Sequence, residues 1–153
     1  MKALKFIVEI GLCALLVTAC SSSHNPPGNP SKPDSAPVTL TGTEWVLQDL
    51  AGTPALASVK ATLAFPETRR AAGNASCNRF TGSVDVSGDT IRFAALASTR
   101  MACADNAVSS QETEYLNALG AAKRFEWKEP ILLIYVEGYG KPLRFTRLTP
   151  AKP

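Results

Sequence analysis

Four cysteines and one histidine are the side chains of this 153-residue sequence that could supply the sulfur and nitrogen ligands of a zinc site, or a thiol nucleophile and its imidazole base. They are Cys13, Cys20, Cys77, Cys103 and His24. A catalytic thiol needs a base such as imidazole beside it, and a structural zinc site needs four ligands. Because His24 lies in a segment with no pattern of a folded element, we predict no catalytic residue, no metal, no cofactor and no enzyme activity.

The first twenty residues have the pattern of an export signal. Lys2 and Lys5 precede an apolar run that is uninterrupted only over residues 10–19. That length suits a signal peptide core of about 7–15 residues and is too short for a membrane helix of about 20. The run ends in Val-Thr-Ala-Cys at residues 17–20, which resembles a bacterial lipobox. We therefore predict a signal peptide over residues 1–19 and lipidation of Cys20, the alternative being an ordinary cleavage site with an incidental cysteine.

The segment after Cys20 is a predicted tether. Residues 20–37 are rich in Ser, Pro, Gly, Asn and Asp and show no apolar periodicity, so they cannot bury enough surface to offset the entropy of ordering. Ser21 stands where Gram-negative lipoproteins retained at the inner membrane usually have aspartate. The resemblance implies a bacterial envelope protein, anchored in the outer membrane and facing the periplasm.

Two cysteines remain once Cys13 leaves with the signal peptide and Cys20 carries the lipid. In an oxidising compartment two such thiols most often pair, and we predict a Cys77–Cys103 disulfide. Two free or buried thiols are the alternative. In the chain-entropy account, closing a loop of this length stabilises the fold by about 3–4 kcal/mol.

Apolar alternation predicts mainly β structure over residues 38–149. Expected strands, including one hairpin over 81–95, cover residues 43–50, 58–65, 69–77, 81–95, 123–128, 131–138 and 142–148. A capping box at residues 109–112 followed by Tyr115, Leu116 and Leu119 predicts one helix. The expected fold class is α+β, a small antiparallel curved sheet or half-barrel with the helix packed against it. Its interior is either filled by Trp45, Phe65, Phe93 and Leu133 or hollow.

The net charge of +3 is weak, and the longest basic cluster is the Arg69-Arg70 pair. Nucleic-acid binding needs a basic stripe with interleaved aromatic residues. We therefore predict no nucleic-acid partner.

Five stretches together resemble the META domain (HslJ-like) family of bacterial lipoproteins and secreted envelope proteins. They are GTEWVLQDLAG, GNASCNRFTGSV, LASTRMAC, ETEYLNAL and LRFTRL, within residues 38–149. The family usually has glycine before the first cysteine, where this chain has Ser76. The resemblance implies a β-rich half-barrel with one helix, similar to a pilotin lipoprotein, and a link to heat-shock or antibiotic tolerance, and it implies no catalytic activity.

The motif residues have two interpretations each. Asn78, Arg79 and Arg100 can form a recognition rim for an anionic partner. Alternatively, Asn78 shapes a turn, and each arginine lies over apolar surface and pairs with a carboxylate. Thr99 and Met101 are expected to face the interior, and Glu112 to lie in the first helical turn, where it complements the helix dipole.

These observations predict a lipid-anchored, non-enzymatic envelope protein. Its partners are the membrane, through the N-terminal lipid, and an unknown envelope protein, with a role in partner binding or in stress or antibiotic tolerance. The alternative is a carrier of a small hydrophobic ligand or acyl chain in a half-barrel cavity.

Overall fold

The computed structural model describes residues 39–148. The predicted signal peptide, the lipid attachment at Cys20 and the predicted tether lie outside these residues. Within residues 39–148, none of the helical structure is both long enough and apolar enough to cross a bilayer.

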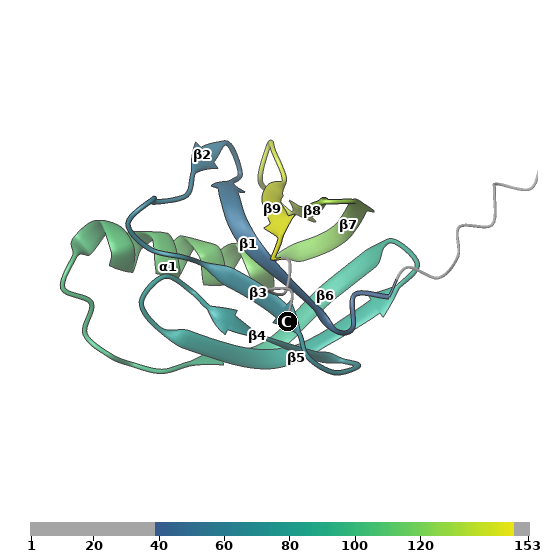
Figure 1. Cartoon of the computed structure of the whole chain (residues 1–153), viewed down its shortest axis with the longest axis horizontal. Coiled ribbons are helices and arrows are strands. Elements are labelled where there is room, and N and C mark those ends of the chain that lie inside the picture. The colour runs from purple at the N-terminus through teal and green to yellow at the C-terminus, as the bar shows by residue number, and fades with distance from the viewer. Residues whose placement is uncertain (1–38, 149–153) are drawn as a thin grey trace, which may run out of the picture. The chain divides into compact units, whose positions relative to one another are not determined.

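Nine strands and one helix make up the described part of the chain (Figure 1). In chain order they are β1 (Thr43–Leu50), β2 (Thr53–Pro54), β3 (Thr62–Phe65), β4 (Arg70–Asn74), β5 (Arg79–Ser87), β6 (Thr90–Ser98), α1 (Asn106–Gly120), β7 (Ala122–Lys128), β8 (Ile131–Val136) and β9 (Leu143–Arg147). All of the strand pairings are antiparallel, in the order β2-β1-β3-β4-β5-β6-β7-β8-β9.

The sheet closes on itself, which corrects the expected half-barrel. β9 pairs with β1, for example at Trp45↔Arg147 and Leu47↔Phe145. Eight strands therefore form a closed barrel, and the two-residue β2 is an addition to β1. Alternation along one strand shows which face is buried, but closure depends on a pairing between the two ends of the domain that no local pattern contains.

The closure is uneven around the barrel. β5 and β6 pair at seven positions, whereas β6 and β7 pair only at Thr90↔Arg124. The chain between β6 and β7 forms α1 (Figure 1). Tyr115, Ala118 and Leu119 of this helix are buried in the core. The helix therefore adds core packing to a barrel in which β6 pairs with β7, and β3 with β4, at only one position each.

The loops of the barrel lie at two ends. The helix end holds the connections 75–78, 99–105 and 137–142 together with α1. The turn end holds the entry segment 39–42 and the connections 66–69, 88–89 and 129–130. This division follows from the antiparallel order of the strands, because every second connection returns to the same end.

Side chains fill the barrel interior. Trp45, Phe65 and Phe93 are buried there, and all belong to one contiguous hydrophobic cluster. The core residues of β8 are Leu132, Ile134 and Val136. The candidate Leu133 lies on the other face of the strand and is only half-buried. Every residue of β8 from 131 to 136 is apolar, so the sequence did not indicate which alternate set points inward.

Several element boundaries differ from the expectation. β4 ends at Asn74 rather than at residue 77, and β6 extends to Ser98 rather than to residue 95. β3 begins at Thr62 rather than at residue 58. The helix begins at Asn106, because the Asp105 side chain accepts a hydrogen bond from the Ala107 N–H at 2.7 Å and caps it. The predicted capping box at residues 109–112 therefore lies inside the helix.

Candidate functional site

The disulfide predicted between Cys77 and Cys103 is present at the helix end. It joins the β4–β5 connection to the loop 99–105, with the two Cα atoms 6.0 Å apart. Both cysteines are half-buried. The bond ties together two loops that are 26 residues apart in sequence, and in this state neither sulfur is available as a nucleophile.

Glu112 of α1 is the central acceptor of the helix end. Its carboxylate accepts hydrogen bonds from the Cys77 N–H at 3.1 Å, the Asn78 N–H at 2.6 Å and the Asn78 side-chain amide at 2.8 Å. Hydrogen bonds to a charged acceptor are stronger than neutral ones. Glu112 thus attaches the helix to the cysteine loop, a role that we missed because its partners lie 34 and 35 residues away.

Asn78 connects the same carboxylate to the second loop. Its side-chain oxygen accepts hydrogen bonds from the Thr99 hydroxyl and the Met101 N–H, both at 2.8 Å. Its amide group also donates to the Met101 carbonyl at 3.3 Å. The residue is only 4% exposed. The structure therefore assigns Asn78 an internal, loop-shaping role, in agreement with the turn interpretation, and it does not lie on an open rim.

Two further contacts fix α1. The Gln111 amide donates to the Ser76 hydroxyl at 2.7 Å, and the Leu56 N–H donates to the Gln111 side-chain oxygen at 2.7 Å. Ser76 has φ 121°, in the region that favours glycine. A serine at this position therefore has a conformational cost, and the hydrogen bond from Gln111 offsets part of it.

Tyr115 completes the attachment of the helix. Its ring packs edge-on against Phe80, with the ring centroids 6.0 Å apart, and its hydroxyl donates to the Thr62 carbonyl at 3.2 Å. Burial raises the pKa of Tyr115 far above its ordinary value. The phenol therefore stays protonated and acts as a hydrogen-bond donor inside the barrel.

The helix end also brings possible metal ligands together. The sulfur atoms of Cys77 and Cys103 and a carboxylate oxygen of Glu112 lie within 4.8 Å of one another. A cysteine binds a metal ion as a thiolate, whereas the sulfur atoms of Cys77 and Cys103 are bonded to each other. The Glu112 carboxylate already accepts three hydrogen bonds. The chemistry of this donor set is that of a structural crosslink.

Arg79 and Arg100, the other two candidate rim residues, are exposed beside this crosslink. Arg79 is hydrogen-bonded to the residue preceding Arg100: its N–H donates to the Thr99 hydroxyl at 3.2 Å, and its carbonyl accepts from the Thr99 N–H at 3.0 Å. Within residues 39–148, neither guanidinium group has a carboxylate at ion-pair distance. The structure therefore places the two arginines on adjacent segments and gives neither the carboxylate partner of the alternative interpretation.

Met101 is exposed, contrary to the expectation that it faces the interior. The residue is 60% exposed, although Asn78 holds its backbone N–H and carbonyl. Thr99 is exposed as well, although its hydroxyl donates a hydrogen bond to the buried Asn78. The hydrogen bonds from Asn78 fix the Met101 backbone, and the Met101 side chain points into solvent.

An apolar groove lies next to Arg79, along the outer wall of β3 and β4. It has a volume of about 350 Å³, and its lining includes Thr62, Ala64, Ala72 and Arg79. β3 and β4 pair only at Ala64↔Ala72. The small side chains on these two strands leave the hollow open.

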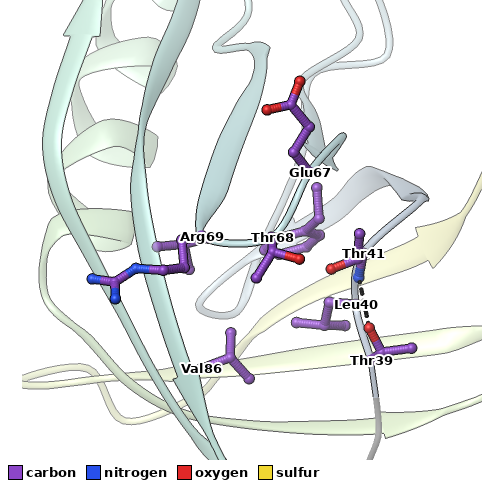
Figure 2. Close-up of a pocket in the computed structure, with 9 residues that line it drawn as sticks. Thr39, Leu40, Thr41, Glu67, Thr68, Arg69 and Val86 are labelled. Atoms are coloured by element: carbon purple, nitrogen blue, oxygen red, sulfur yellow. Dashed lines mark hydrogen bonds between the residues drawn. The ribbon is translucent and has the colours of Figure 1, made fainter.

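A second pocket, of about 220 Å³, lies at the turn end (Figure 2). Its lining includes Thr39, Thr41, Thr68 and Val86. Figure 2 shows that the charged group of Arg69 points away from the space between Thr68 and Val86, and it forms an ion pair with Asp85 at 2.9 Å. The pocket thus presents hydroxyl and aliphatic groups, without a convergent set of charged groups.

The fold and the crosslink together define a class of protein, a small closed antiparallel β-barrel with one helix and a disulfide at the helix end. The META domain family matches residues 38–149. The chain therefore belongs to the META domain family.

Solved structures support this fold. The chain is similar to a protein from Burkholderia xenovorans solved by NMR, with 28% identity, coverage of 79% of this chain and 99% of that chain, and a TM-score of 0.58. A second NMR structure has 23% identity, coverage of 70% and 90%, and a TM-score of 0.58. No curated protein sequence matches the chain.

Proposed function

We propose that this protein is a lipid-anchored, non-enzymatic protein of the bacterial envelope whose META domain binds a partner protein through its outer surface. The observation that carries the proposal is the filled barrel. Trp45, Leu63 and Leu132 are fully buried within one contiguous core cluster. A filled interior favours binding on the outside over the alternative of a hydrophobic ligand carried inside.

The anchor is supported by the sequence before the domain. The lipobox-like residues 17–20 and the Pro- and Ser-rich segment through residue 37 have the pattern of an acylation site followed by a tether. Eighteen residues span at most about 60 Å when extended. Such a tether allows the domain to reach partners away from the membrane surface.

The anchor can be tested by fractionating cells that produce the wild type or Cys20→Ser. We expect the wild type in the outer-membrane fraction with an acylated N-terminal cysteine in its peptide mass, and the variant without acylation and absent from the outer-membrane fraction. An unmodified cysteine in the wild type would contradict the anchor.

Partner binding can be tested by photo-crosslinking from positions spread over the barrel surface of the anchored wild type, followed by mass spectrometry. A reproducible crosslinked envelope protein at one face supports the proposal. Absence of any adduct from every face would contradict it.

Native mass spectrometry of the same material tests the alternative that the protein carries a hydrophobic ligand, because a co-purifying lipid would favour that alternative.

The proposed contribution to envelope stress or antibiotic tolerance requires a separate comparison. Cells that lack the protein are expected to lose viability under heat or antibiotic challenge, and the wild-type protein is expected to restore it. If partner binding at the membrane underlies tolerance, Cys20→Ser will restore less. Equal survival with and without the protein would contradict this part of the proposal.

A further inference from the structure

We propose that Arg79, Arg100 and Met101 form a docking surface, here called the Arg–Met surface, for an acidic, extended segment of a partner protein. The proposal rests on the proposed function, since it names the chemistry of the partner and the face that binds it.

The charge balance of the exposed arginines is the first observation. Arg69, Arg70, Arg124 and Arg147 each have a carboxylate partner in the described part of the chain. Arg79, Arg92, Arg100 and Arg144 have none among residues 39–148, and all four are exposed. Of these four, Arg79 and Arg100 lie on segments that are hydrogen-bonded to each other through Thr99. Two such cations on neighbouring segments attract carboxylates and discriminate against basic partners.

The second observation is that the loop carrying these side chains is rigidly supported from inside. The disulfide, the Asn78 side chain and the Glu112 carboxylate hold the segment 99–103 against the cysteine loop. A surface fixed before binding loses little entropy when a partner docks. The disulfide and these hydrogen bonds thus fix the backbone that carries Arg100 and Met101, and the two side chains themselves are exposed.

The third observation is apolar surface beside the charges. Among the large apolar residues described as exposed, Met101 has the highest exposed fraction, 60%. Methionine and arginine are both enriched in protein interfaces. The groove along β3 and β4, with Arg79 in its lining, provides an adjacent hollow for small apolar side chains.

These features favour an extended acidic peptide over other occupants. The groove follows two strands on the outer wall of the barrel, which suits a chain in extended form, and its small-residue floor has room for side chains such as Ala or Val. Two arginines match two or three carboxylates spaced along such a segment. Adsorption to an anionic membrane would instead use a broader basic area.

The direct test measures binding of labelled peptides to the mature, acylated protein in nonionic detergent. The probe is a ten-residue extended peptide with alternating Glu and Ala or Val, and its control has Lys in place of Glu. We expect the acidic peptide to bind and the basic one not to bind. Raising the salt concentration to about 0.3 M should weaken binding severalfold, because the Debye length shortens.

Matched charge reversals locate the site. Arg79→Glu with Arg100→Glu is expected to weaken acidic-peptide binding by at least about tenfold. Arg92→Glu with Arg144→Glu changes the same charge at two exposed arginines that are not part of the Arg–Met surface, and is expected to weaken it less than about threefold. Met101→Ala should weaken it by about threefold to tenfold. Unchanged thermal unfolding would show that all of these variants fold.

Three outcomes would overturn the proposal. They are equal binding of both peptides, an Arg79/Arg100 double variant that binds within twofold of wild type, and binding of the Cys20→Ser protein to phosphatidylglycerol vesicles that depends on the two arginines. If the acidic peptide does not bind but crosslinking captures a partner at another face, this inference fails and the proposed function stands. If no face captures a partner, the proposed function fails as well.

Discussion

The two ends of the barrel are held together by different forces. At the helix end, a disulfide and a set of directed hydrogen bonds from Asn78 and Glu112 organise the loops. At the turn end, Trp45 packs edge-on against Trp127 with ring centroids 5.5 Å apart, and the Arg147 guanidinium lies 5.4 Å from the Trp127 ring. Packing dominates there, and polar bonds dominate at the helix end.

The difference shows how a small domain keeps long loops in one conformation. Aromatic pairs prefer edge-to-face or offset arrangements, but they tolerate ring-centroid separations from about 4.5 to 7 Å. A buried polar network is directional and costly to break, so it specifies one geometry. The exposed Arg79, Arg100 and Met101 lie at the helix end, where the disulfide and the hydrogen-bond network fix the backbone. A backbone fixed in this manner can hold a binding surface in one geometry.

Removing the covalent bond is expected to have the largest effect. The double variant Cys77→Ala, Cys103→Ala should lower the free energy of unfolding by about 3.5 kcal/mol, because the unfolded chain regains the entropy of a 26-residue loop. Denaturant unfolding of oxidised wild type and the variant measures this. A loss below about 1 kcal/mol would mean that the hydrogen-bond network alone holds the helix end.

Breaking the polar network is expected to cost nearly as much. Glu112→Ala leaves two backbone N–H groups and the Asn78 amide without their acceptor, and should destabilise the domain by about 3 kcal/mol. Glu114→Ala is the matched control, since Glu114 is exposed on the same helix and should cost less than about 0.5 kcal/mol. Equal losses for both variants, measured by urea unfolding, would contradict the central role of Glu112.

The two tryptophans of the turn end should respond unequally. Trp45 is fully buried, and its indole N–H donates to the Thr43 hydroxyl at 2.7 Å, so Trp45→Phe should cost about 2 kcal/mol. The Trp127 indole N–H is buried without a partner within the described residues. Trp127→Phe removes that unpaired donor and should change the stability by less than about 1 kcal/mol. A larger loss for Trp127→Phe than for Trp45→Phe, in thermal or urea unfolding, would contradict this ranking.

Removing the Tyr115 hydroxyl is expected to have a small effect at neutral pH and a distinct pH dependence. Tyr115→Phe loses the hydrogen bond to Thr62 and should cost about 1 kcal/mol. Burial raises the pKa of Tyr115, whereas an unfolded tyrosine ionises near pH 10. Below that pH both states are protonated, so the wild type should lose stability only as the pH rises above about 10.

The loss of stability above about pH 10 should be smaller in Tyr115→Phe than in the wild type. In the wild type, Tyr115 can ionise more easily in the unfolded chain than in the folded one, and this difference is absent in the variant. Tyr139→Phe, at a partly buried tyrosine, serves as the control. Stability curves from pH 8 to 11.5 make the comparison. Parallel curves for wild type and Tyr115→Phe would show that Tyr115 is not the group responsible.

Local patterns in the sequence were sufficient for most of the strands and for the disulfide. Alternation in residues 43–50 and 81–95 predicted β1 and the β5–β6 hairpin, because the side-chain period of a strand is two residues and is written directly in the chain. Setting aside Cys13 in the predicted signal peptide and Cys20 at the predicted lipidation site left Cys77 and Cys103 to pair, and the structure has this disulfide. The motifs around these cysteines also indicated the META domain family.

Tertiary structure alone decided the rest. Closure through β1 and β9, the choice of Leu132 over Leu133 for the core, and the burial of Asn78 beneath an exposed Met101 all depend on contacts between distant residues. The same holds for Glu112, whose partners are more than thirty residues away. A side chain's neighbours in sequence report its strand or helix, whereas its hydrogen-bond partners are set by how those elements pack.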